Sequence, residues 1–129
     1  MTPEPHPTPA RPRCYRFQRH LRITRHSEFE RVMRAGRRGT DRVLTMWVLP
    51  NDRPHPRLGL VVGRKCGCAV QRNRWKRVLR TAFRLSQYDL PAGFDFVCAP
   101  RAGGTADLAA CTEALVRLAE RLARRFSET

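Results

Sequence analysis

The sequence predicts an α+β domain, a two-layer α/β sandwich in which helices cover one sheet face and part of the other face contacts solvent. Three observations favour this class. The 129 residues suit a single domain. Apolar residues recur with a helical period in some stretches and alternate in others. The predicted elements follow in the order helix, strands, helix, strand, helix, without an internal repeat.

The first thirteen residues differ in composition from the rest of the chain. They hold five of the ten prolines and show no apolar periodicity, so we expect residues 1–13 to be a disordered tail. A single domain would then cover residues 14–129. This end lacks the apolar segment of a secretory signal, and no run approaches the roughly 20 apolar residues of a membrane span. We therefore expect a cytoplasmic protein.

A short helix is predicted from the segment HSEFERVMRAG. Ser27 and Glu30 have the spacing of a capping box, in which the serine binds a backbone amide of the first turn and the glutamate reaches back. Gly36 would end the helix after about two turns. The apolar face would carry Phe29, Val32 and Met33.

Three strands are predicted from short apolar runs bounded by turn residues. RVLTMWVLP alternates, so Thr45 and Trp47 would lie on the face opposite its aliphatic residues. The turn NDRPHP joins this run to RLGLVVG, and we expect the two to pair as antiparallel neighbours. FDFVCA is the third run. The three strands would cover residues 42–50, 57–63 and 94–99.

Two longer helices complete the predicted fold. A projection of residues 70–85 at 100° per residue separates an apolar side from a cationic side. Trp75, Leu79 and Phe83 lie on the apolar side and should pack inward. A second amphipathic pattern predicts a helix over residues 112–126. The cationic side of the first of these helices carries Arg72, Asn73, Lys76, Arg77, Arg80 and Arg84.

The chain is strongly basic. It has 26 Lys or Arg against 11 Asp or Glu, a formal net charge of +15, which favours binding to nucleic acid before an anionic membrane surface. Residues 63–84 contain no Asp or Glu, and Arg72, Lys76, Arg80 and Arg84 follow one another at intervals of four. Like charges at this spacing cost about 0.2–0.5 kcal/mol per pair. We infer that an external anion offsets this repulsion.

RNA fits this basic helix better than duplex DNA does. The predicted elements do not form the three-helix unit that helix-turn-helix proteins place around a recognition helix. Phe29 and Trp47 would either stack on unpaired bases or pack in the core, and the sequence leaves both roles open.

The residues offer little for catalysis by the chain itself. The acidic residues are scattered, His20 and His26 precede the predicted first helix, His55 lies in a Pro-rich turn, and no phosphate-binding loop is present. Cys66 and Cys68 form a C-x-C motif without a second pair, so we expect thiols and not a metal site. The chain is predicted to bind RNA and to carry no catalytic or metal-ligating residues.

The segment RLGLVVGRKCGCAVQRNRWKRVLRTAFR resembles the signature of the protein component of bacterial ribonuclease P. That family has a strand with R-x-G, then a basic pair, then G-x-A-V-x-R-N-R-x-K-R-x-x-R. LRITRHSEFERVMRAGRRG and LPAGFDFVCAPRAG resemble the segments before and after it, so the resemblance covers residues 21–126. It implies an α/β sandwich with a left-handed βαβ crossover, in contrast to the usual right-handed connection.

The resemblance also implies a function and its partners. In that family a catalytic RNA cleaves precursor tRNA to produce the mature 5′ end, with Mg²⁺ held mainly by the RNA. The protein is the non-catalytic subunit of this endoribonuclease, and it binds the catalytic RNA and the 5′ leader of the precursor. One protein per catalytic RNA is expected.

Roles for single residues follow where this sequence matches the family motif. Phe29 matches an aromatic residue of the cleft that holds the leader. Met33 stands where a second cleft aromatic often appears, and Trp47 where the family places an aromatic residue on the cleft strand. Arg101 lies near a basic position after the last strand, where APRAGG departs from the family pattern. The RNA-contacting residues would be Arg64, Lys65, Arg72, Asn73, Arg74, Lys76, Arg77 and Arg80.

Two other functions stay open on sequence alone. A ribosomal or assembly-type RNA-binding protein would use the same basic surface. A protein-only nuclease would cut precursor tRNA without an RNA subunit, although the scattered acidic residues argue against it. Only a ribonuclease P subunit should stimulate 5′ maturation when it is added to a catalytic RNA.

Overall fold

The computed structural model describes residues 15–127. The predicted Pro-rich tail, residues 1–13, lies outside this range. No helix among the described residues is long and apolar enough to cross a membrane. The elements in chain order are the 3₁₀ turn η1 (Arg19–Leu21), α1 (His26–Ala35), β1 (Arg37–Thr40), β2 (Leu44–Pro50), β3 (Arg57–Leu60), the 3₁₀ turn η2 (Arg64–Cys66), α2 (Ala69–Ser86), β4 (Phe94–Pro100) and α3 (Leu108–Ser127).

The four strands form one sheet in the order β1-β2-β4-β3. β2 pairs with β4 as an antiparallel neighbour over all seven residues, from Leu44 opposite Pro100 to Pro50 opposite Phe94. β3 pairs with β4 in parallel. The expected antiparallel pairing of the runs 42–50 and 57–63 is therefore wrong, because β4 lies between them. A parallel neighbour needs a long connection, and α2 supplies it in the β3–α2–β4 crossover.

β1 is a short edge strand that the hydrophobic pattern does not predict. Its sequence RRGT has no alternation of apolar and polar side chains, and only Gly39 is buried. A Cβ at Gly39 would lie 3.0 Å from the methyl groups of Leu122 on α3. The absence of a side chain lets this strand run close under the last helix.

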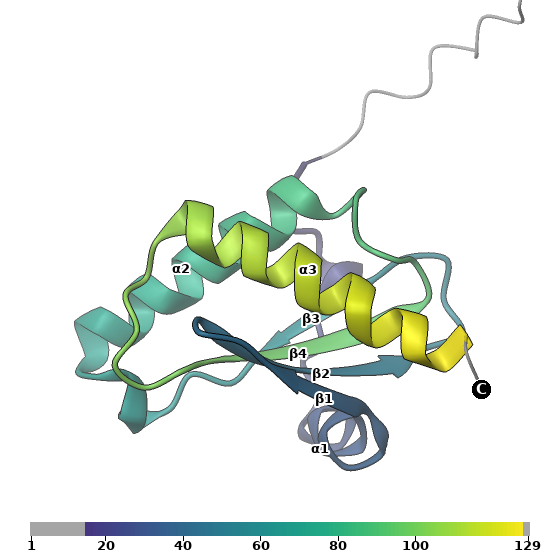
Figure 1. Ribbon diagram of the computed structural model, residues 1–129, viewed down its shortest axis with the longest axis horizontal. Helices are drawn as coiled ribbons and strands as arrows, with labels where there is room; N and C mark the ends of the chain where they lie inside the picture. Colours follow the sequence, from purple (N-terminus) through teal and green to yellow (C-terminus); the bar gives the residue numbers. More distant parts are fainter. Residues whose placement is uncertain (1–14, 128–129) are drawn as a thin grey trace, which may run out of the picture.

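Helices cover the two faces of the sheet unequally (Figure 1). α2 and α3 lie on one face, where the main core contains the fully buried Met46, Phe96 and Cys98. α1 lies on the other face and covers only part of it, with Val32 and Val97 in a smaller cluster. The predicted α+β class is confirmed, as are the inward positions of the α2 residues Trp75, Leu79, Ala82 and Phe83.

The start of α1 differs from the prediction. The helix begins at His26 after Arg25, which gives no side-chain cap, so the Ser27–Glu30 capping box is wrong. Glu30 instead pairs with His26 at 3.0 Å. The chain before the helix is bound to the edge of β3, where the Ile23 N–H donates to the Leu58 carbonyl at 2.9 Å. This contact holds the chain that leads into α1 against the sheet.

Gly36 ends α1 as predicted. Its N–H donates to the Val32 carbonyl at 2.8 Å. A Cβ at Gly36 would overlap the carbonyl oxygens of Val32 and Val48. Glycine is needed here for the close approach of α1 to β2.

Candidate RNA-binding surface

α2 turns its cationic side outward. The apolar side, with Trp75 and Leu79, is buried against the sheet and α3. Arg80 is exposed, while Arg72 and Lys76 are half-buried along the same side of the helix. Of the other predicted contact residues, those exposed to solvent are Arg64, Lys65, Asn73, Arg74 and Arg77.

The carboxylates within the described part of the chain do not neutralise this helix. Within residues 15–127, no ion pair involves an Arg or Lys of α2. Arg84 donates through Nη1 to the Tyr15 carbonyl at 3.4 Å, which leaves its charge uncompensated. The Nε of Arg72 is buried and has no hydrogen-bond partner among these residues. The helix therefore presents uncompensated positive charge.

The turn before α2 places the predicted basic pair beside the helix. Arg64 and Lys65 form most of η2 and are exposed. Gly67 follows with a φ of 112°, a conformation that favours glycine, and the Gln71 side chain occupies the space where a Cβ would lie. The Gln71 side chain accepts a hydrogen bond from the Cys68 N–H at 2.9 Å, which caps the start of α2.

Cys68 is the N-cap residue, and its thiol faces solvent. The Gln71 N–H donates to this thiol and lowers its pKa from the ordinary value of 9.0, with the positive charge of Arg72 as a smaller cause. Thiolates are generally stabilised at helix N-termini in this way. The backbone N–H groups at the start of α2 therefore favour negative charge, as the cationic side chains along the helix also do.

A groove of about 350 Å³ adjoins the cationic side of α2. Phe29 of α1 contributes an aromatic wall, and Lys76 and Arg80 of α2 contribute positive charge. Phe29 can lie against β3 because of Gly59, where a Cβ would lie 2.5 Å from the Phe29 ring. The remaining residues that line the groove are Phe17, Arg22, Ile23, Thr24, Leu58 and Leu60.

Six of the nine lining residues were not predicted from the sequence, and Phe17 and Arg22 are the aromatic and charged ones among them. Arg22 places its guanidinium 4.6 Å from the centre of the Phe17 ring and donates to the Phe17 carbonyl at 3.0 Å through Nη2. Both residues lie before α1, Phe17 in an irregular stretch and Arg22 in an isolated β-bridge to Leu58, so neither falls in a periodic pattern. The only signal in the sequence is an aromatic residue near a basic one.

The other two predicted cleft residues do not line this groove. Met33 is exposed on the last turns of α1. Trp47 is half-buried and, like Phe29, packs against the smaller cluster between α1 and the sheet. The Arg38 guanidinium lies 5.9 Å from the Trp47 ring centre. Phe29 therefore belongs to both the groove and this cluster.

The sequence model of the family Ribonuclease P matches residues 17–123. The chain belongs to the ribonuclease P protein family. It is thus the protein component of an endoribonuclease that binds RNA and takes part in the 5′ maturation of tRNA.

Individual relatives agree with this family. The ribonuclease P protein component of Photobacterium profundum is 38% identical over 112 residues, covering 86% of this chain and 92% of the relative. The ribonuclease P protein from Thermotoga maritima has a TM-score of 0.70 and 30% identity, over 78% of this chain and 96% of that structure. The Staphylococcus aureus protein has a TM-score of 0.67 and 25% identity, over 80% and 94% of the two chains.

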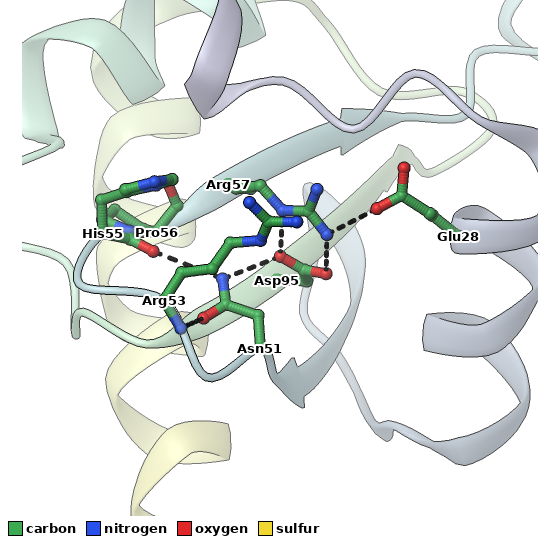
Figure 2. A network of polar contacts seen from close by, with 7 residues as sticks. All are labelled: Glu28, Asn51, Arg53, His55, Pro56, Arg57 and Asp95. Atoms are coloured by element: carbon green, nitrogen blue, oxygen red, sulfur yellow. Dashed lines mark hydrogen bonds and ion pairs between the residues drawn. The ribbon is translucent and has the colours of Figure 1, made fainter.

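A buried polar network holds α1 to the sheet of this ribonuclease P protein (Figure 2). Arg57 on β3 lies between Asp95 on β4 and Glu28 in the first turn of α1. Asn51, after β2, donates to Asp95 at 2.9 Å and to the His55 carbonyl at 3.3 Å. Because Phe29 follows Glu28, this network also fixes one wall of the groove.

The described residues 15–127 contain no group of three or more His, Cys, Asp or Glu placed to hold a metal ion. The groove and the outer side of α2 are lined by cationic, apolar, amide and hydroxyl groups, without a carboxylate. Mg²⁺ prefers carboxylate oxygens, phosphate oxygens and water. The donor groups of this surface therefore do not fit a Mg²⁺ site made by the protein alone.

Proposed function

We propose that the chain binds the catalytic RNA of ribonuclease P through α2 and holds the 5′ leader of precursor tRNA in the adjoining groove. The observation that carries this proposal is the outward row of cations on α2, which has no ion-pair partner within residues 15–127 and borders a groove with an aromatic wall. Phosphates would supply the missing negative charge, and unpaired bases would suit the aromatic wall.

The phosphate contacts come from α2 and the turn before it. Each neutralised phosphate releases counterions, so the logarithm of the affinity falls by about 0.7 to 0.9 per contact for each tenfold rise in salt. Arginine can also donate two parallel hydrogen bonds to one phosphate. The proposed contact residues are Arg64, Lys65, Arg72, Asn73, Arg74, Lys76, Arg77 and Arg80.

The leader would enter between α1 and α2. Phe29 offers a ring for stacking, while Lys76 and Arg80 are placed for the phosphates of the same strand. Stacking on one face of a base is tolerant of sequence, so we expect many leaders to bind. Met33 and Trp47 would contact nucleotides that extend past the groove along α1 and β2.

The Mg²⁺ ions of the reaction would be held mainly by the RNA. The protein's part is to bring RNA segments together at the cationic surface and so shape the sites where RNA oxygens hold the ions. We expect one protein for each catalytic RNA, since one surface would contact it. A cytoplasmic location follows from the position of precursor tRNA in bacteria.

The test is reconstitution with a catalytic RNA and a precursor tRNA. The wild-type protein should lower the Mg²⁺ concentration needed for 5′ cleavage, and R72E/K76E should raise it again while keeping the fold. R124E/R125E, at the end of α3, makes the same change in net charge as a control. Normal cleavage by R72E/K76E at low Mg²⁺ would contradict the proposal, and cleavage by the protein without RNA would indicate a protein-only nuclease.

A further inference from the structure

A second groove, of about 610 Å³, lies between the β1–β2 turn and the first turns of α3. None of the residues that line this groove belongs to the sequence motif of α2. The β1–β2 turn, the connection from β4 to α3 and the start of α2 lie at the same end of the molecule (Figure 1). The charged residues of this groove are Asp41, Arg42, Arg101, Glu113 and Arg117.

The two carboxylates of the groove are already paired. Arg117 donates to Asp41 at 2.9 Å through Nη2 and to Glu113 at 3.3 Å through Nη1. The other Asp41 oxygen accepts hydrogen bonds from the N–H groups of Val43 and Leu44 at 2.7 and 2.9 Å. Arg117 and the backbone of the turn therefore offset part of the negative charge that would repel a phosphate, and the groove still has three arginines against two acids.

The other two arginines keep their charge available. Neither Arg42 nor Arg101 forms an ion pair with a residue in the range 15–127. Arg101 is held in place, because its N–H donates to the Val43 carbonyl at 3.0 Å and its Nη1 to the Asp41 carbonyl at 3.1 Å. A guanidinium has five N–H groups, so this anchored side chain can still bind an anion with little loss of entropy.

This arginine pair is continuous with the start of α2. The Cys66 thiol lies 3.9 Å from the Pro100 carbonyl, which places η2 against the end of β4 next to Arg101. A Cβ on Gly104 would lie 3.6 Å from the Trp75 ring of α2. Exposed cations thus extend from Arg64 and Lys65 across the end of β4 to the β1–β2 turn.

We propose that Arg42 and Arg101 form a second phosphate-binding site, which takes the ribose-phosphate backbone of an RNA that also contacts α2. This inference rests on the proposed function. RNA is the partner because the site has more arginines than acids, has its acids paired with Arg117 and adjoins the start of α2 through the contact of η2 with the end of β4. The phosphates could come from the catalytic RNA or from the precursor tRNA, which share this chemistry.

The experiment compares R42A/R101A with R124A/R125A, which removes two exposed arginines at the opposite end of α3. The dissociation constant is measured against salt concentration, for catalytic RNA alone and for precursor tRNA with the assembled holoenzyme. Loss of two phosphate contacts should lower the slope by about 1.4 to 1.8 and weaken binding about 15- to 30-fold at 0.15 M salt. The arm in which the slope falls identifies which RNA occupies the site.

Two further variants keep the outcomes separate. R42E tests the site without removing the hydrogen bonds of Arg101, and its melting curve checks the fold. The proposal of a second site is wrong if R42E and R42A/R101A give the same salt slopes as R124A/R125A with both RNAs. The proposed function still stands in that case, provided that R72A/K76A lowers the slope. If R72A/K76A also leaves the slope unchanged, the proposed function itself fails.

Discussion

Arg57 binds the carboxylate of Asp95 through two hydrogen bonds, from Nε to Oδ1 at 2.7 Å and from Nη2 to Oδ2 at 2.6 Å. The same Nη2 lies 2.8 Å from Glu28. β3, β4 and α1 are thus joined at one guanidinium, whose pKa is raised above its ordinary value by the hydrogen bonds to Asp95 and then to Glu28. The pair is buried, with 9% and 6% of the two side chains exposed.

Removal of this guanidinium should destabilise the protein strongly. Arg57→Ala leaves the buried Asp95 without a cationic partner, and breaking one side of a buried pair costs about 3–5 kcal/mol. Glu28→Ala should cost less, because Glu28 is 27% exposed and Arg57 keeps Asp95. The free energies of unfolding in urea measure both. Equal losses for the two variants would show that Asp95 is not the main partner.

The sequence predicts the helices of this fold better than its strand order. The helical spacing of Trp75, Leu79 and Phe83 is sufficient to predict which side of α2 faces the core, since local spacing alone determines which side is apolar. The neighbours of β3 depend on pairing with a strand that follows it by more than thirty residues. Hydrophobic alternation carries no information about that choice, so the expected antiparallel pair was wrong.

The sequence predicts the part of the candidate site that depends on local spacing, and not the part that depends on contacts between distant segments. The α2 cations lie in one continuous motif, and their outward direction follows from the helical period. The groove brings together Phe17, Phe29 and Lys76 from segments that are far apart in sequence, and Phe17 lies in no regular element. Arg57 and Asp95 are 38 residues apart, so their pairing also depends on the tertiary fold.

Phe29 should matter more than Met33 for binding of the leader. Phe29 lines the groove beside Lys76, whereas Met33 is exposed outside it. Loss of one stacked base costs about 1–3 kcal/mol, so Phe29→Ala should weaken binding of a precursor tRNA about 5- to 150-fold, with little effect on mature tRNA. Met33→Ala on the same helix should have a smaller effect, because Met33 lies outside the groove. Equal effects on precursor and mature tRNA would argue against a leader contact.

Gly59 should be required for the groove because it admits the Phe29 ring. Gly59→Ala places a methyl group 2.5 Å from that ring, and such overpacking costs about 1–3 kcal/mol. We expect Phe29 to shift, with lower stability and weaker precursor binding. Gly63→Ala is the control, since nothing lies within 4 Å of its added Cβ. If both variants behave alike, contact with Phe29 is not the reason for glycine at position 59.

Asp41 should contribute stability that is lost in acid. Burial alone would raise its pKa, but hydrogen bonds from Leu44 and Val43 and the pair with Arg117 outweigh burial and lower the pKa below 3.8. A lowered folded-state pKa gives stability above the unfolded value that disappears as pH falls through the folded value. Melting temperature should therefore drop more steeply below pH 4 for the wild type than for Asp41→Asn. Parallel curves would contradict this role, and Asp52→Asn, in an exposed turn, serves as the control.

Anions should stabilise the isolated protein through α2. Arg72, Lys76 and Arg80 repel one another at intervals of four residues, at a cost of about 0.2–0.5 kcal/mol per pair, and none of them has an ion-pair partner within residues 15–127. Sulfate that binds only the folded state would add about 2.7 kcal/mol at 100 times its dissociation constant. The melting temperature should therefore rise with sulfate more than with chloride at equal ionic strength.

The variant R72Q/K76Q separates specific binding from a general salt effect. It should melt at a higher temperature than the wild type without sulfate, because the repulsion along α2 is relieved. It should also gain less from sulfate, because two of the anion-binding groups are gone. R124Q/R125Q removes the same charge from the end of α3 and should keep the full sulfate response. An equal sulfate response in all three proteins would mean that the anion acts on the whole surface and not on α2.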